Sequence, residues 1–265
     1  GELGTGGTMS VGIGFQALRN HGNDGGTSQN TAIGNAAGRN ITSGALNVLV
    51  GSTTGGALTT GNNNVVIGYG ALTTEDTGSF NVAVGYLALT SQNADDTYNV
   101  AVGYEAGKSI TTGPYNTIVG SKSGDALTTG DSNTVLGYNA LSTEDTGDRN
   151  VAIGYEALNA LNFDGSAYNV AIGYQAGHDI SSGIFNTIIG GLAGDKITTG
   201  VRNTILGYDA GGALTEANQS VAIGDSALAT ATTQSFNTAV GSFALNLATS
   251  SENVAVGYRA GAATS

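Results

Sequence analysis

The sequence predicts an all-β chain: a parallel β-solenoid of about 15 coils with a 17-residue period, built as a single repeat domain over residues 1–265. Three observations predict it. A motif of Asn, Val or Thr, a small or aliphatic residue, Ile, Val or Leu, and Gly recurs from end to end. Its glycine returns after 17 residues in ten of the fourteen intervals and after 16 to 20 in the others. The apolar spacing has no 3.6-residue period, which excludes helices.

Each copy of the motif predicts one short strand that ends at the glycine, where the chain is free to adopt positive φ. We expect each coil to hold two short strands and two turns, stacked on its neighbours through backbone hydrogen bonds. The fifteen motif glycines are Gly14, Gly34, Gly51, Gly68, Gly85, Gly103, Gly120, Gly137, Gly154, Gly173, Gly190, Gly207, Gly224, Gly241 and Gly257.

A longer period is superimposed on the short one. The stretches NTAIGNAAGRNITSG from Asn30, NVAVGYEAGKSITTG from Asn99 and NVAIGYQAGHDISSG from Asn169 are close variants, 69 and 70 residues apart. Four short repeats therefore make one module. The order slips after Asn169, as the insertion of one coil would explain.

The three residues after the motif asparagine, here the first, second and third places, predict how the strands are covered. The first and third places share one face, and we expect the third-place aliphatic residues to fill the coil interior. The second place points the other way and holds no polar side chain, so we expect sister chains of a homotrimer to cover it. The predicted trimer interface is Ala32, Leu49, Val66, Ala83, Ala101, Ile118, Val135, Ala152, Ala171, Ile188, Ile205, Ala222, Ala239 and Ala255.

Composition narrows the function. The chain has 44 glycines, no cysteine and only 11% charged residues, which is unlike an ordinary globular enzyme. A net charge of −12 disfavours binding to nucleic acid or anionic lipid. The sequence has no run of 18 apolar residues, so no membrane insertion is expected. Neither a metal nor a cofactor is expected.

The motif carries a resemblance. NTAIG at Asn30, NVAIG at Asn150 and SVAIG at Ser220 are similar to the repeated head motif of trimeric autotransporter adhesins. The longer NVAIGYQAG and NTAVGSFAL resemble repeats of many phage tail fibres. The resemblance implies a left-handed β-roll assembled as a homotrimer and displayed on a virion or a bacterial surface. The 17-residue coils are longer than those of the adhesin heads, and the sequence lacks their coiled-coil stalk and membrane anchor. These absences favour the phage fibre, or indicate that the sequence holds only the head fragment of an adhesin.

Two repeated residue types could bind a ligand. Tyrosine follows many motif glycines, and an aromatic residue often precedes the motif asparagine, as in Tyr98 and Tyr104. Such rows could bind sugars, but packing against the same row in adjacent coils is the favoured interpretation. The asparagines themselves are expected to bond to one another and to turn backbone.

Charged residues offer weaker candidates. The acidic pairs Glu75 with Asp76, Asp95 with Asp96, and Glu144 with Asp145 could cleave glycans or hold calcium, but we interpret them as solvated turns. His21 and His178 have no serine, cysteine or ligand spacing around them, which disfavours a catalytic triad or a zinc site. The glycine-rich stretches GTGG from Gly4 and NDGG from Asn23 are interpreted as turns.

The sequence thus predicts a non-enzymatic, extracellular fibre segment of a phage tail, with itself and a host surface receptor or glycan as partners. A bacterial trimeric adhesin head is the alternative within this class. A glycan-cleaving tailspike and an ice-binding solenoid are alternatives of other classes. Ice binding is disfavoured because the TTG pairs at Thr59, Thr111, Thr128 and Thr198 do not form an unbroken ladder.

Overall fold

The fold was analysed in a computed structural model, which describes residues 9–21 and 28–262. It confirms an all-β parallel β-solenoid of about 14–15 coils with a period of about 17 residues, and the described residues contain no helix. It follows that none of them forms a helix of the length and apolarity needed to span a bilayer. Backbone contacts divide the chain into two compact units, Gly1–Ser132 and Asn133–Ser265.

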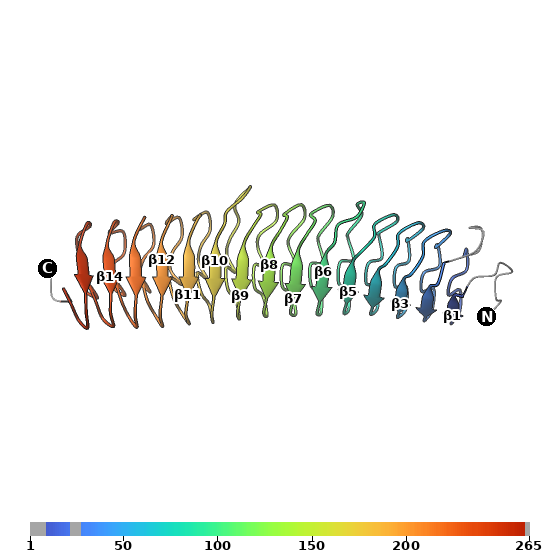
Figure 1. Ribbon diagram of the computed structural model, residues 1–265, viewed down its shortest axis with the longest axis horizontal. Coiled ribbons are helices and arrows are strands. Elements are labelled where there is room, and N and C mark those ends of the chain that lie inside the picture. The colour runs from blue at the N-terminus through green and yellow to red at the C-terminus, as the bar shows by residue number, and fades with distance from the viewer. Residues whose placement is uncertain (1–8, 22–27, 263–265) are drawn as a thin grey trace. The chain divides into compact units, whose positions relative to one another are not determined.

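Each coil contributes one three-residue strand (Figure 1). The strands of the first unit are β1 (Val11–Ile13), β2 (Thr31–Ile33), β3 (Val48–Val50), β4 (Val65–Ile67), β5 (Val82–Val84), β6 (Val100–Val102) and β7 (Thr117–Val119). Those of the second are β8 (Thr134–Leu136), β9 (Val151–Ile153), β10 (Val170–Ile172), β11 (Thr187–Ile189), β12 (Thr204–Leu206), β13 (Val221–Ile223), β14 (Thr238–Val240) and β15 (Val254–Val256).

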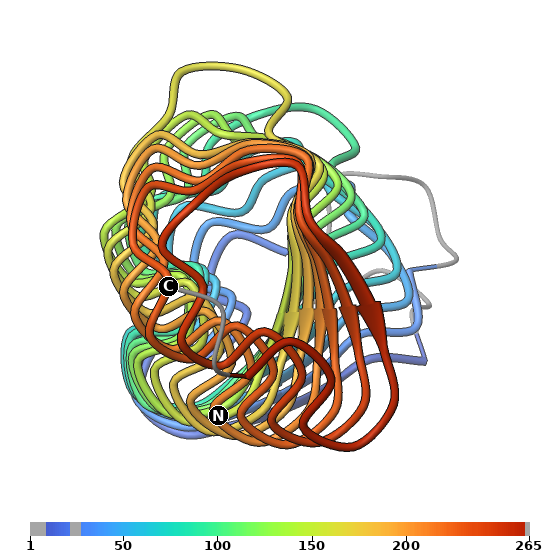
Figure 2. The ribbon, with the colours of Figure 1, turned by 90° about the vertical axis from the view of Figure 1, so that its left-hand side faces the viewer.

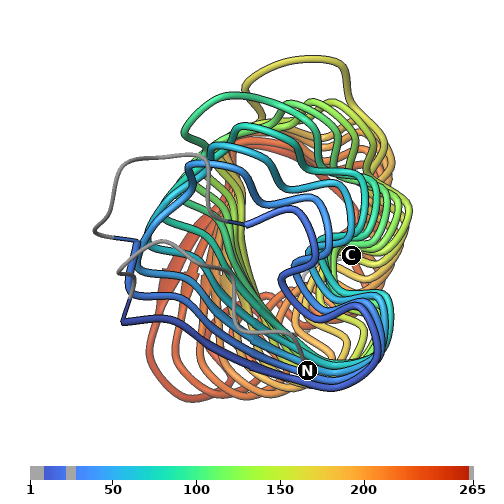
Figure 3. The same ribbon diagram turned by 90° about the vertical axis from the view of Figure 1, so that its right-hand side faces the viewer.

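Within each unit, consecutive strands pair in parallel and in register. Val100, Ala101 and Val102 of β6, for example, lie beside Thr117, Ile118 and Val119 of β7. The prediction of two strands per coil is wrong, because the strands occupy one side of the coil and turns form the rest (Figures 2 and 3). Those turns still donate hydrogen bonds from coil to coil, but left-handed residues within them prevent an extended conformation.

The motif glycine is required by close approach of the backbone. Gly103 has a φ of 145°, a conformation that side chains disfavour. A Cβ atom built on it would lie 2.3 Å from the carbonyl oxygen of Gly120 in the next coil. Any side chain at this position would therefore push neighbouring coils apart.

The second-place row lies inside the coil of a single chain. All fourteen residues predicted to form the trimer interface are buried in the isolated chain, and Ala101 and Ile118 have no exposed surface. Their assignment to contacts with sister chains is therefore wrong. The third-place residues, predicted to fill the interior, instead point out of the coil, as the alternating burial of β6 and β8 shows.

The asparagine decides this orientation. Asn99 is buried, and residues two apart in a strand share a face, so Ala101 follows it into the interior while Val100 and Val102 turn outward. The sequence contains this signal in the asparagine, although the larger third-place residues favour the opposite orientation.

Side chains of neighbouring coils fill the interior together, with small residues in one coil next to larger residues in another. The coil of Ala101 has a second small residue, Gly107, whose missing side chain leaves room for Leu89, Ile110 and Ile118. Carbon atoms of these three side chains lie 3.0–3.1 Å from where a Cβ of Gly107 would be. Small residues in one coil are thus matched by larger ones in the coils on either side.

Candidate functional site

The outer face of the sheet is formed by the first- and third-place side chains. It is defined separately on each unit, and its residues are Val, Thr, Ile and Leu. Several third-place residues are exposed: Ile67 is 39% exposed, Leu136 47% and Leu206 45%. Soluble monomers rarely expose extended apolar surface, so this face has the composition of an interaction surface.

Tyrosines line the edge of the outer face that follows the motif glycine; we call this the tyrosine row. In the first unit Tyr69, Tyr86 and Tyr104 are stacked, with ring centroids 5.5 and 5.3 Å apart. In the second unit Tyr138, Tyr155 and Tyr174 repeat the arrangement at 5.5 and 5.3 Å. The expectation that these rings pack on their equivalents in adjacent coils is confirmed.

A second aromatic row lies at the other end of the strands, before the motif asparagine. Phe80 and Tyr98 stack at 5.1 Å between ring centroids, and Tyr98 stacks on Tyr115 at 5.7 Å. In the second unit Tyr168 and Phe185 stack at 5.6 Å. An arginine lies at each end of that pair. The guanidinium carbon of Arg149 is 5.7 Å from the ring centroid of Tyr168, and that of Arg202 is 5.3 Å from the ring centroid of Phe185.

The motif asparagines form a buried ladder. The backbone N–H of Asn47 donates to Oδ1 of Asn30 at 2.9 Å, and Nδ2 of Asn47 donates to the same oxygen at 3.1 Å. The amide also donates to the carbonyl oxygen of Gly61 at 2.8 Å. The expected bonding of asparagines to one another and to turn backbone is confirmed.

The acidic loops are only partly the solvated turns that the sequence predicted. Glu75 and Glu144 are completely buried, which corrects that prediction for the glutamates. Oε1 of Glu144 accepts from the backbone of its own loop, including Gly147 at 2.8 Å, and Oε2 accepts from the N–H of Phe163 at 3.1 Å. The physical reason is that the following coil is longer, and the carboxylate satisfies backbone donors there.

Those longer coils protrude beyond their neighbours. They form loops 93–97 in the first unit (Figure 3) and 162–166 in the second (Figure 2). Glu75 holds the first loop through Gln92 Nε2 at 3.1 Å and the N–H of Ala94 at 3.3 Å. Burial raises the pKa of Glu144, and its backbone hydrogen bonds only partly oppose that effect.

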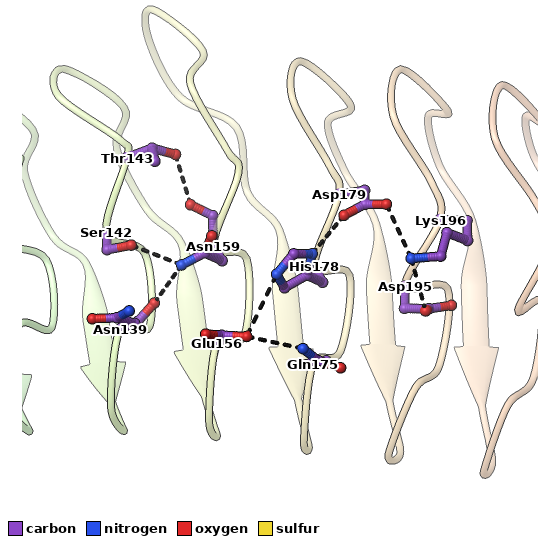
Figure 4. A network of polar contacts seen from close by, with 10 residues as sticks. All are labelled: Asn139, Ser142, Thr143, Glu156, Asn159, Gln175, His178, Asp179, Asp195 and Lys196. Atoms are coloured by element: carbon purple, nitrogen blue, oxygen red, sulfur yellow. Dashed lines mark hydrogen bonds and ion pairs between the residues drawn. The ribbon is translucent and has the colours of Figure 1, made fainter.

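A chain of polar contacts crosses the turns of the second unit (Figure 4). Nδ1 of His178 lies 2.5 Å from Oδ1 of Asp179, and its Nε2 lies 3.6 Å from Oε2 of Glu156. Lys196 continues the chain, with Nζ 3.2 Å from Asp179 and 3.3 Å from Asp195. His178 thus bridges two carboxylates of different coils.

The charged groups of Asp179 and Lys196 in this network stabilise each other. Partial burial by itself raises the pKa of Asp179, but hydrogen bonds from His178 and Lys196 outweigh it and hold that pKa below its usual value. The pKa of Lys196 is raised, chiefly by its bond to Asp179. Both carboxylates in contact with His178 have a second partner, Gln175 for Glu156 and Lys196 for Asp179. This is expected of a structural link between coils.

His21 has serine neighbours that its sequence surroundings did not reveal. Its Nε2 lies 2.6 Å from Oγ of Ser28 and 3.2 Å from Nδ2 of Asn30. Ser10, which occupies the motif asparagine position of the first coil, accepts from the N–H of Asn30 at 3.0 Å. Since Ser28 is buried, this cluster extends the asparagine ladder and does not present a nucleophile to solvent.

The threonines of the TTG turns use their hydroxyl groups within the fold. Oγ1 of Thr59 donates to the carbonyl oxygen of Asp76 at 2.8 Å, and Oγ1 of Thr111 donates to that of Thr128 at 3.1 Å. These protons are directed along the stack and not toward water. The geometry therefore gives no support to ice binding.

Over residues 9–21 and 28–262, no group of three or more His, Cys, Asp or Glu side chains is arranged to hold a metal ion. The glycine-rich stretches from Gly4 and Asn23 lie outside the described residues. Comparisons with protein-family models, curated proteins and solved structures found no match.

Proposed function

We propose that this protein is a structural fibre segment that assembles as a homotrimer through the outer face of its sheet. The observation that carries the proposal is that every strand of both units places an aliphatic third-place side chain on that face, half-buried in some strands and exposed in others. The proposed interface is therefore formed by the first- and third-place rows, and not by the second-place row that the sequence predicted. Burying an aliphatic side chain contributes about 1.5–3 kcal/mol, so many half-exposed residues together supply a large driving force.

The rigidity expected of a fibre has a local basis. In each unit the interior combines apolar packing with a ladder of buried amides, and the turns also donate hydrogen bonds between coils. A rod of this kind positions a binding element at a distance from its base. We propose attachment to a host surface as its role, in a phage tail fibre or, alternatively, in a bacterial adhesin head.

The enzymatic alternative receives less support. A glycan-cleaving site needs two carboxylates flanking the substrate, about 5–9.5 Å apart. Glu156 and Asp179 are both engaged with His178, while Glu75 and Glu144 are inaccessible to solvent. The proposed rod is therefore non-enzymatic, and incubation with capsular glycans is expected to release no reducing ends.

Native mass measurement tests the assembly. The proposed species has three times the 26.2 kDa of one chain. Replacing Leu206 with Asp places a charge on the outer face and is expected to yield folded monomers, whereas Thr199→Asp at an exposed turn position should leave the trimer intact. A wild-type protein that stays monomeric at high concentration would refute the proposal.

A further inference from the structure

The tyrosine row of the second unit is interrupted at three places, and only one of them lies between two coils that both carry a tyrosine. Tyr138, Tyr155 and Tyr174 are stacked, the next coil has Gly191 at the equivalent place, and the coil after it has Tyr208. We call the space over Gly191 the notch. Its two walls are Tyr174, 54% exposed, and Tyr208, 59% exposed, against 42% for Tyr155 inside the stack.

The space beside Gly191 is bounded on one side by the Tyr208 ring and contains no side chain of its own coil. A Cβ on Gly191 would lie 3.6 Å from Cδ2 of Tyr208, an ordinary contact distance, and would meet no backbone atom within 4 Å. Since adjacent rings of this row stack at 5.3–5.5 Å between centroids, a ring at position 191 would continue the row. Along the chain, Gln175 and Asp209 directly follow the two tyrosines that bound the notch.

Other aromatic groups of the same unit are covered by arginine. Arg149 and Arg202 close the two ends of the Tyr168–Phe185 stack. Arg259 lies over Tyr258 at 5.3 Å and over Phe243 at 5.7 Å from the ring centroids. Within the described residues, neither Tyr174 nor Tyr208 has a cation over its ring.

The surroundings of the notch are negative. Burial raises the pKa of Asp209, and the neighbouring charges of Asp195 and Asp225 raise it further. Lys196, which belongs to the same coil as Gly191, is already paired with Asp179 and Asp195. A cation is thus favoured over a neutral or anionic group at this position.

We propose that the notch between Tyr174 and Tyr208 binds the guanidinium group of an arginine side chain on a partner protein. The planar cation would stack between the two phenol rings, with its N–H groups directed toward Asp209. Lysine fits less well because its ammonium group is compact and strongly hydrated. The partner is accordingly a protein segment with an exposed arginine, and the site does not require the proposed trimer.

Blocked tripeptides test the proposal on the full-length protein. The peptides are Gly-Arg-Gly and its lysine and citrulline counterparts, and binding is followed by saturation-transfer NMR and by tyrosine fluorescence, since the chain has no tryptophan. We expect the arginine peptide to bind about two- to fivefold more tightly than the lysine peptide, and the neutral citrulline peptide to bind more weakly still.

Two variants locate the site. Gly191→Tyr should complete the row and abolish the preference for arginine. Ser242→Tyr adds the same ring at the equivalent place of a coil outside the notch, and this variant should retain the preference for arginine. Circular dichroism verifies that both fold. The proposal would be overturned if the arginine and citrulline peptides bound equally, or if Gly191→Tyr left binding unchanged. It would also be overturned, in favour of a sugar site, if maltohexaose bound and the arginine peptide did not.

Discussion

The two faces of one sheet follow different rules. Inward, Asn186 repeats its neighbours because its amide is held in the ladder, whereas the second place varies from Ala171 to Ile188 because larger side chains fill the space that small ones in adjacent coils leave. Outward, the rows of Thr187 and Ile189 vary only between Val and Thr or among Ile, Val and Leu. The comparison teaches that each inward residue is constrained by the ladder and by the coils beside it, while the outward side chains are free of that constraint.

The largest expected effect is on the interior backbone. Gly154→Ala should destabilise the fold by about 4 kcal/mol or more, because its φ is 137° and the new Cβ would lie 2.1 Å from the Gly173 oxygen. Gly191→Ala, at an unhindered outer position, should change stability by about 0.5 kcal/mol or less. Urea unfolding monitored by circular dichroism measures both, and similar losses would contradict the distinction between the faces.

The next effect compares adjacent side chains of β11. Ile188→Ala leaves a cavity in the interior and should cost about 2–5 kcal/mol, whereas Ile189→Ala should cost about 1 kcal/mol or less in the monomer. If the proposed trimer forms, Ile189→Ala should instead weaken assembly, seen by sedimentation. Reversed unfolding costs would show that the sheet orientation is misassigned.

A smaller effect depends on pH. Because the folded-state pKa of Glu144 is raised, the folded state binds a proton more tightly than the unfolded chain, so stability should fall as pH rises above about 4.3 until that folded pKa is passed. Glu144→Gln should remove this part of the pH dependence. Asp164→Asn, at an exposed loop position, should keep it, and urea midpoints over a pH series provide the measurement.

The smallest effect concerns backbone strain on the outer surface. Leu46 is exposed and has a φ of 60°, so Leu46→Asn should stabilise the fold by about 0.5–1 kcal/mol, since asparagine tolerates the left-handed conformation. Leu247 is equally exposed without positive φ, and Leu247→Asn should bring no such gain. Thermal melting compares the two variants, and equal shifts of the melting temperature would contradict the proposed strain at Leu46.

Much of the fold was predictable because the period is explicit. The motif glycines locate all fifteen strands, and the bonding of the asparagines and the stacking of Tyr98 and Tyr104 with their neighbours follow from repetition at strand spacing. The burial of Glu144 was missed, since the residues that hold it belong to a longer coil 19 residues on. The notch was visible only as one glycine in a row of tyrosines.

The sequence by itself determined the period, the parallel stacking of coils and the position of each strand, because these follow from local residue types repeated at a fixed interval. Only the tertiary structure decided which face of the strand is inside. Apolar residues occupy both faces, so burial preference alone cannot choose between them. The choice was made by hydrogen bonding: the asparagine amide needs partners within the coil, and the alternation of the strand then turns the second-place residue inward and leaves the third outside.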